Sequence, residues 1–223
     1  MSTIPLLLEW RGQRLWISPE RCLFWEEQKM LILSDLHIGK SAHFRKAGIA
    51  VPQQIFQEDM HRLYQQIHQF NPDRILITGD LFHSSSNIEH DVFARWRESL
   101  GTREMILVRG NHDRLDDAVY KNMGVRCVGE KMEVGDFIFM HQLPQELADD
   151  KYYFTGHQHP GIKLSGKGKQ SVTLPCFYFS AEHAVLPAFS YFSGKHLVEP
   201  QKLDRLFAVL KDGNQSSIID VPF

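Results

Sequence analysis

The sequence lacks long hydrophobic runs. The longest apolar run near its start, Ile4–Leu8, is far shorter than the ~20 apolar residues that cross a bilayer. It also lacks the length and cleavage site of a signal-peptide core. We therefore expect a cytoplasmic protein without membrane contact.

Cysteine is also scarce. Its three residues, Cys22, Cys127 and Cys176, are widely spaced, odd in number and without any C-x-x-C pair. This excludes a disulfide framework and a zinc ribbon, so we expect reduced thiols.

Repeats, low-complexity segments and long charge runs are missing as well. Lys+Arg number 25 and Asp+Glu number 27, and the net charge of −2 gives no overall basic field that would attract nucleic acid. Any binding of a polyanion must be local. With 43% hydrophobic and 23% charged residues, the 223-residue chain is composed like an ordinary globular protein. We expect one domain, residues 1–223, with a sizeable core.

The first 125 residues alternate short apolar runs with amphipathic segments. Buried strands are predicted over 31–33, 74–78 and 105–108. Between them, apolar residues recur at helical spacing over 56–67 and 88–100. This order predicts an α/β fold with right-handed crossovers and a largely parallel sheet that carries helices.

After residue 124 strand patterns dominate, which predicts a second sheet. The predicted strands are 132–134, 137–140, 152–155, 172–174, 177–179 and 188–192. The tail fits helical spacing from Leu203 to Leu210, but 207–210 and 217–219 also fit a hairpin around a glycine-containing loop. We favour the hairpin.

Histidine is the one abundant residue type, with 12 in 223 residues. Several histidines, acids and amides directly follow predicted strands. Because the carboxyl ends of parallel strands face one crevice, we expect these side chains to converge. The candidate metal ligands are Asp35, His37, Asp80, Asn111, His141, His157 and His159.

The ligand types indicate the metal chemistry. Carboxylate, amide oxygen and imidazole without thiolate suit Mn²⁺, Fe²⁺ or Zn²⁺ rather than a structural zinc site. One carboxylate can bridge two such ions. Two ions ~3.5–4 Å apart can activate a water as hydroxide and clamp phosphoryl oxygens, which predicts phosphoester hydrolysis.

The motifs carry a resemblance to a known family. In order and spacing, Asp35-x-His37, Gly79-Asp80, Gly110-Asn-His-Asp113, His141 and Gly156-His-x-His159 resemble the five signatures of the calcineurin-like metallophosphoesterases. The resemblance covers about residues 30–160. It implies a two-sheet sandwich flanked by helices, with a dinuclear site at the carboxyl ends of the strands.

The resemblance also implies roles for individual residues. It implies two divalent ions, with Mn²⁺ foremost and Fe²⁺ or Zn²⁺ as alternatives. Asp35, His37, Asp80 and His159 would hold one ion, and Asp80, Asn111, His141 and His157 the other. His112 would bind the phosphate and protonate the leaving group, oriented by Asp113. His112 as a phosphate ligand alone remains an alternative.

A longer set of motifs is similar to the ligase-associated DNA-damage-response branch of that superfamily. The motifs are Ser34-Asp-Leu-His-Ile-Gly-Lys-x-x-x-Phe-Arg-Lys-x-Gly48, Gly79-Asp-Leu-Phe-His83, Leu174-Pro-Cys-Phe177 and Leu186-Pro-Ala-Phe189. They imply a DNA nuclease of bacterial repair. His83 departs from the wider superfamily, in which an Asp or another small polar residue often stands at this position.

Basic residues near the signatures predict a rim that contacts substrate phosphates, although ordinary solvated loop charge explains them about equally well. The candidates are Lys40, Arg45, Lys46 and Arg114, with Lys163, Lys167 and Lys169 beyond the last signature.

Each candidate ligand, taken by itself, also has a purely structural interpretation. An Asp after a strand commonly caps a turn, and an Asn often occupies a left-handed turn position. It is the convergence of seven such residues that favours a metal site.

Three functions compete. The leading one is a metal-dependent phosphodiesterase that cleaves DNA; protein partners are not indicated. A small-molecule phosphatase or nucleotide hydrolase would use the same metals. A catalytically dead interaction scaffold is the third, and the complete ligand set argues against it. Substrate choice depends on loops around the metals, so the sequence does not decide between diester and monoester.

Overall fold

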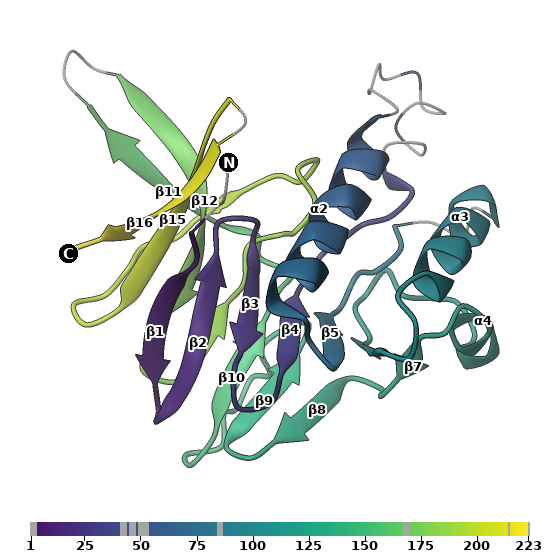
Figure 1. Ribbon diagram of the computed structural model, residues 1–223. Helices are drawn as coiled ribbons and strands as arrows, with labels where there is room; N and C mark the ends of the chain where they lie inside the picture. The colour runs from purple at the N-terminus through teal and green to yellow at the C-terminus, as the bar shows by residue number, and fades with distance from the viewer. Residues whose placement is uncertain are drawn as a thin grey trace.

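The computed structural model describes residues 4–40, 44, 48, 54–83, 87–166, 170–213 and 215–222. Within them the chain forms two mixed sheets with helices on one side (Figure 1). The predicted α/β two-sheet fold is thereby confirmed. No described helix is long and apolar enough to cross a membrane.

The first sheet has seven strands that lie in chain order. Its first three pairings are antiparallel and its last three are parallel, so it is less parallel than predicted. The strands are β1 (Leu6–Trp10), β2 (Gln13–Ser18), β3 (Cys22–Trp25), β4 (Met30–Leu33), β5 (Arg74–Thr78), β6 (Glu104–Val108) and β7 (Arg126–Cys127).

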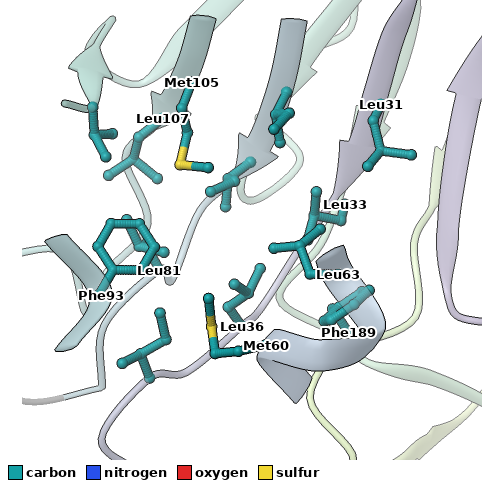
Figure 2. Packing of buried hydrophobic residues seen from close by; sticks show 14 of the residues in the cluster. Leu31, Leu33, Leu36, Met60, Leu63, Leu81, Phe93, Met105, Leu107 and Phe189 are labelled. Atoms are coloured by element: carbon teal, nitrogen blue, oxygen red, sulfur yellow. The ribbon is translucent and has the colours of Figure 1, made fainter. Parts of the chain in front are cut away.

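Helices connect the parallel strands. They are α2 (Gln54–Phe70), α3 (Asn87–Glu98) and the short α4 (Asp117–Asn122). The predicted helices over 56–67 and 88–100 correspond to α2 and α3, and α4 was not predicted. Met60 and Leu63 of α2 share a buried cluster with Leu31 and Leu33 of β4, and this cluster also includes Phe93 of α3 (Figure 2). The helices therefore fix the parallel strands that end at the candidate ligands.

The second sheet has nine strands and faces the other side of the first. Phe137, Phe154 and Phe207 of this sheet share a buried cluster with Ile17 and Leu76 of the first. The strands are β8 (Lys131–Val134), β9 (Phe137–Met140), β10 (Tyr152–Thr155), β11 (Pro160–Ser165), β12 (Ser171–Phe179), β13 (His183–Val185), β14 (His196–Leu197), β15 (Arg205–Asp212) and β16 (Gln215–Val221). The β15–β16 hairpin confirms the predicted interpretation of the tail.

Two predictions in this half are corrected. The strands predicted over 172–174 and 177–179 are one strand, β12, which changes partner at Pro175: its register with β11 ends there, and its register with β15 begins at Cys176. The strand predicted over 188–192 is not formed. Only Ala188 makes a β-bridge, with Ser34, because the following carbonyls bond to arginine side chains.

The three cysteines are all free, and none forms a disulfide. Cys22 and Cys176 are buried, which raises the pKa of each thiol to about 12. They therefore act as small apolar core residues, as expected.

Candidate metal centre

The parallel strands of the first sheet bring four candidate ligands to one edge. Asp35 and His37 follow β4, Asp80 follows β5 and Asn111 follows β6. Backbone bonds join the loops: the Asp35 amide donates to the Gly79 carbonyl at 3.1 Å, and the His37 amide donates to the Asp80 carbonyl at 2.9 Å. The chain therefore converges as the sequence predicts.

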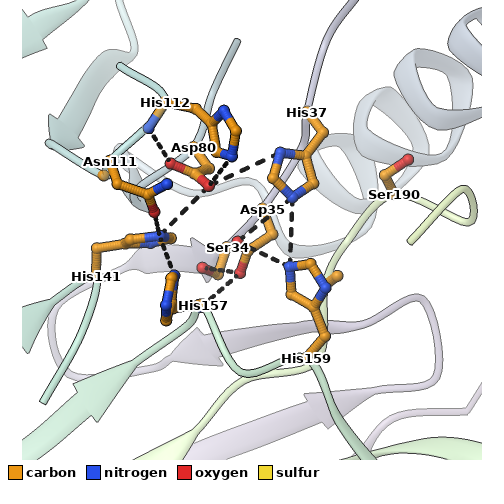
Figure 3. A network of polar contacts seen from close by, with 12 residues as sticks. Ser34, Asp35, His37, Asp80, Asn111, His112, His141, His157, His159 and Ser190 are labelled. Atoms are coloured by element: carbon orange, nitrogen blue, oxygen red, sulfur yellow. Dashed lines mark hydrogen bonds and ion pairs between the residues drawn. The ribbon is translucent and has the colours of Figure 1, made fainter. Parts of the chain in front are cut away.

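The second sheet brings the remaining three ligands to the same place. His141 follows β9, and His157 and His159 follow β10, which is parallel to β9. The Gly156 amide donates to the His141 carbonyl at 3.0 Å, which joins the two loops. Side chains from both sheets thus meet in one polar cluster (Figure 3).

The backbone of these loops is strained in a systematic way. Five of the seven candidate ligands have a positive φ although none is glycine, a conformation that costs ~1–2 kcal/mol per residue. They are Asp35 (55°), His37 (50°), Asp80 (55°), His157 (65°) and His159 (49°). Strain gathered on the polar residues of one cluster is characteristic of a functional site.

Two glycines of the signatures allow this close packing. A Cβ on Gly156 would lie 1.7 Å from Ser34 Oγ, and one on Gly79 would lie 2.1 Å from His141 Nδ1. Any side chain at either position would displace the neighbour that supports a candidate ligand.

One group of ligands centres on Asp35, which is fully buried. His159 Nε2 lies 3.1 Å from Asp35 Oδ1, and His37 Nε2 lies 3.3 Å from His159 Nε2. His37 Nδ1 is buried and has no hydrogen-bond partner among the described residues. Two imidazole nitrogens and a carboxylate oxygen therefore point at one another, as around a cation.

The other group centres on His141. Its Nδ1 lies 2.9 Å from the Thr78 carbonyl, which can only accept, so Nδ1 carries a proton. Its Nε2 faces Asn111 Oδ1 at 3.1 Å, His157 Nδ1 at 3.2 Å and Asp80 Oδ2 at 3.4 Å. When this ring is neutral, its Nε2 lone pair therefore points toward two oxygens, those of Asn111 and Asp80. A cation at this point would satisfy all of them.

The pKa values agree with a site that needs positive charge. Burial alone would lower the pKa of His141, but the hydrogen bond and charge of Asp80, with Asp35, raise it to about 9. Burial alone would raise the pKa of Asp80, but His141 and the His112 amide lower it to about 2. The acids are ionised, and in the absence of metal a proton on His141 provides the compensating charge.

His37 differs from His141. Burial lowers its pKa to about 3, which outweighs the attraction of Asp35, so the ring is neutral at ordinary pH. Burial likewise lowers the pKa of His157, helped by His141. Neutral imidazole is the form that binds metals.

His112 stands at the mouth of the cluster. Its amide donates to Asp80 Oδ1 at 3.0 Å, and its ring Nε2 lies 4.0 Å from Asp80 Oδ2. The side chain is 37% exposed, so a substrate can reach it. Its ring lies near the rings of His37, at 5.7 Å, and His83, at 4.8 Å.

Asp113 makes contacts of another kind than the resemblance implies. Its carboxylate accepts hydrogen bonds from the amides of Asp80 at 2.7 Å, Gly110 at 2.9 Å and Leu81 at 3.0 Å, and from the Tyr120 hydroxyl at 3.2 Å. It ties the loops after β5 and β6 together. Any orientation of His112 by Asp113 passes through this backbone framework.

Of the predicted basic rim, two residues lie beside the cluster. Lys40 is partly buried, and burial lowers its pKa although Asp35 and Asp80 oppose this. Arg114 is exposed and donates from Nε to the Asn111 carbonyl at 3.2 Å. Lys163 is exposed on β11. Arg45 and Lys46, like Lys167 and Lys169, lie outside the described residues.

Comparison with known proteins agrees with this geometry. A family model described as calcineurin-like phosphoesterase matches residues 28–157, more than half of the chain. The chain belongs to this family. The resemblance carried by the five signatures is therefore confirmed, and the chain is a hydrolase that acts on phosphoester bonds. The family uses divalent metals, and Asp35, His37, Asp80, His141 and His159 form groups able to hold them.

Solved structures give a second comparison. The crystal structure of Pseudomonas putida nuclease MPE has a TM-score of 0.77 and 25% sequence identity, over 92% of this chain and 96% of its own. YfcE, a phosphoesterase from E. coli, has a TM-score of 0.46 and 15% identity, over 86% of this chain and 97% of its own. Among curated proteins, none matches the chain.

The sequence did not single out the residues that support the family's ligands. Ser34 Oγ lies 2.6 Å from Asp35 Oδ2 and donates to the Thr78 carbonyl at 2.9 Å. Tyr120 supports Asp113. Ser34 directly precedes a ligand, which is a signal that could have found it, whereas Tyr120 has no such signal.

Proposed function

We propose that the chain is a dinuclear metal-dependent phosphodiesterase that cleaves DNA in bacterial repair, acting as a single domain in the cytoplasm. The observation that carries the proposal is the convergence of strained, buried acids and imidazoles into two adjoining groups. The similarity to a nuclease over 92% of the chain supports nucleic acid as the substrate.

The proposal divides the ligands between two ions, Mn²⁺ foremost. Asp35, His37, Asp80 and His159 would hold one, and Asp80, Asn111, His141 and His157 the other. Two observations support this fit: Asp35 Oδ1, buried without a hydrogen-bond partner in the described part of the chain, faces the imidazole nitrogens of His37 and His159, and His141 Nε2 faces the oxygens of Asn111 and Asp80. Two bound ions supply Lewis acidity toward phosphoryl oxygens and an activated water as nucleophile.

The protein's own groups supply the rest. His112 is placed to bind the phosphate and to donate a proton to the leaving oxygen, because its ring is accessible beside Asp80. Asp113 would keep His112 and Asp80 in register through the loop amides. Lys40, Arg45, Lys46 and Arg114 would contact flanking phosphates.

A substrate panel tests the proposal. The purified protein with Mn²⁺ is assayed in parallel on a bis-aryl phosphodiester, an aryl monophosphate, and labelled single- and double-stranded DNA. We expect cleavage of the diester and of DNA, and loss of both on chelation. Faster turnover of the monophosphate than of either diester substrate would instead favour the small-molecule phosphatase.

A further inference from the structure

A segment distant in sequence holds the loop that carries Asp35. Residues 188–191, which we call the clamp segment, run beside this loop. Ala188 forms a β-bridge with Ser34, and the Phe189 amide donates to the Ser34 carbonyl at 2.8 Å. The Ser190 amide donates to the Asp35 carbonyl at 3.2 Å, and Ser190 lies next to the cluster in Figure 3. The left-handed backbone of Asp35 is thus fixed from outside its own sheet.

Two arginines hold the clamp segment through its carbonyls. Arg62 of α2 donates from Nη2 to the Phe189 carbonyl. Arg21 donates from Nη1 to the Ser190 carbonyl at 3.0 Å and to the Ala188 carbonyl at 3.3 Å. Three successive carbonyls are therefore bound by guanidinium groups instead of by a neighbouring strand.

Arg62 is part of a buried charged network. It is 7% exposed and pairs with Asp59 at 2.8 Å and with Glu20 at 3.4 Å. Both acids also hold Tyr191: Asp59 Oδ1 accepts from its amide at 3.3 Å, and Glu20 Oε2 accepts from its hydroxyl at 3.1 Å. The Arg62 guanidinium lies 3.7 Å from the centre of the Tyr191 ring. Every member of the network thus touches the clamp segment or a residue that does.

Such a network is not explained by stability alone. Burying charges costs several kcal/mol per ion, and well-packed apolar residues often serve stability as well or better. A buried guanidinium fork instead fixes the geometry of several partners at once. Here the partners that it fixes adjoin the backbone of a candidate metal ligand.

Arg97 provides an internal comparison. It is 9% exposed and donates to three carbonyls, those of Gly101, Arg103 and Gly124. These carbonyls lie in turns that carry no candidate ligand. Arg97 is therefore a similarly buried arginine that holds backbone carbonyls, whereas Arg62 also pairs with two acids and is connected to the site.

We propose that Arg62 is a positioning residue, which through the clamp segment sets the place of the Asp35 carboxylate and hence the affinity of the Asp35–His37–His159 group for a divalent cation. This inference rests on the proposed metal-dependent function. Arg21 would reinforce the same contact from the other side of the segment.

Calorimetric titration with Mn²⁺ of the metal-free protein tests the proposal, with Arg62→Lys compared to Arg97→Lys. Lysine keeps the charge but loses the fork. We expect Arg62→Lys to weaken binding at one of two sites by ~10–100-fold, the usual range for residues that orient metal ligands. Raising Mn²⁺ should restore kcat on a bis-aryl diester, and Arg97→Lys should lower only the melting temperature.

Equal Mn²⁺ affinity in the two variants overturns the inference. If Arg62→Lys does not fold, Arg21→Lys decides, because Arg21 is less buried than Arg62: a weaker site supports the inference and unchanged affinity overturns it. If the unaltered protein binds no Mn²⁺, the proposed function fails and the inference with it. If it binds two ions and only the variant comparison fails, the proposed function stands.

Discussion

Charged and polar side chains at the two ends of the parallel strands differ in their exposure to solvent. At the amino ends, Lys29 pairs with Asp73, with both side chains more than 60% exposed, and Arg126 pairs with Glu104, with both more than 40% exposed. At the carboxyl ends, the candidate ligands Asp35, His37 and Asp80 are all at most 5% exposed, and they face the equally buried His141 of the second sheet. The same strands therefore carry solvated ion pairs at one end and buried, mutually facing polar groups at the other.

This difference distinguishes residues that contribute only slightly to stability from residues that serve a function. Exposed ion pairs contribute ~0–1 kcal/mol each and can be changed freely. Buried acids and imidazoles in left-handed backbone are costly in the absence of a ligand, and in a folded chain such a cost marks a function. Substitutions at the two ends should therefore have very different consequences, and matched pairs of variants can test this.

The largest effect is expected at the shared ligand. Asp80→Asn weakens both proposed metal positions at once, and losing several kcal/mol of transition-state stabilisation lowers kcat by ~10³-fold or more. Asp73→Asn at the amino ends should leave kcat unchanged. Steady-state hydrolysis of a bis-aryl diester at saturating Mn²⁺ measures both. Near-normal turnover by Asp80→Asn would show that Asp80 does not bridge two metal ions.

His112 should show the next largest effect. His112→Ala is expected to lower kcat on DNA by ~10²–10⁴-fold, the range for a positioned acid, while the metal content stays intact. An aryl leaving group needs less protonation, so the bis-aryl diester should lose less. Metal analysis and kinetics on both substrates measure this. An equal loss on both would make His112 a phosphate ligand and not an acid.

The parts of this fold that sequence predicts are those with a local signal. The strand over 74–78 has an apolar centre, Ile75-Leu-Ile77, and the ligands after it stand in short motifs. Strands β1 and β2 were missed because charged residues such as Glu9 and Arg14 interrupt their apolar alternation. β2 joins the sheet by pairing with β3, and β1 joins it by pairing with β2, so neither depends on a pattern of its own.

At the clamp segment the error is the opposite one, because the sequence predicts a strand there that the structure does not form. Residues 188–192 have the composition of a strand, but their carbonyls are bound by Arg62 and Arg21, which lie more than 120 positions away in sequence. Sequence motifs likewise gave the identity of the candidate ligands but not their support. Contacts of such long range depend on the assembled packing and have no local pattern.

The basic rim should have a smaller effect that depends on the substrate. Lys40→Gln removes a cation beside Asp35 and Asp80 and should raise KM for DNA, with a salt dependence flatter by ~0.9 log unit for a lost duplex phosphate contact or ~0.7 on single strands. Lys29→Gln at the amino ends is the matched control and should change neither. KM measured from low to physiological salt gives the slope.

In this experiment a bis-aryl diester distinguishes an effect on the basic rim from an effect on the catalytic centre. It lacks flanking phosphates, so Lys40→Gln should leave its kinetics unchanged. Equal losses on both substrates would place Lys40 in the catalytic centre, and no loss on DNA would argue against nucleic acid as the substrate.

The smallest effect is expected far from the carboxyl ends, at His183 at the start of β13. Burial lowers the pKa of its ring, whose Nδ1 lies 3.0 Å from Ser180 Oγ. The unfolded chain, with a histidine pKa near 6.5, therefore binds a proton more readily than the folded one. Stability contributed by neutral His183 is fully present above pH ~6.5 and is lost as pH falls below it.

His183→Gln cannot be protonated, so its melting temperature should fall less than that of the unaltered protein between pH 7.5 and 5.5. Turnover at pH 7.5 should be unchanged, because the ring is outside the ligand cluster. Parallel melting curves in chelator measure the difference, and identical pH dependence in the two proteins would show that His183 is as free to protonate in the folded chain as in the unfolded one.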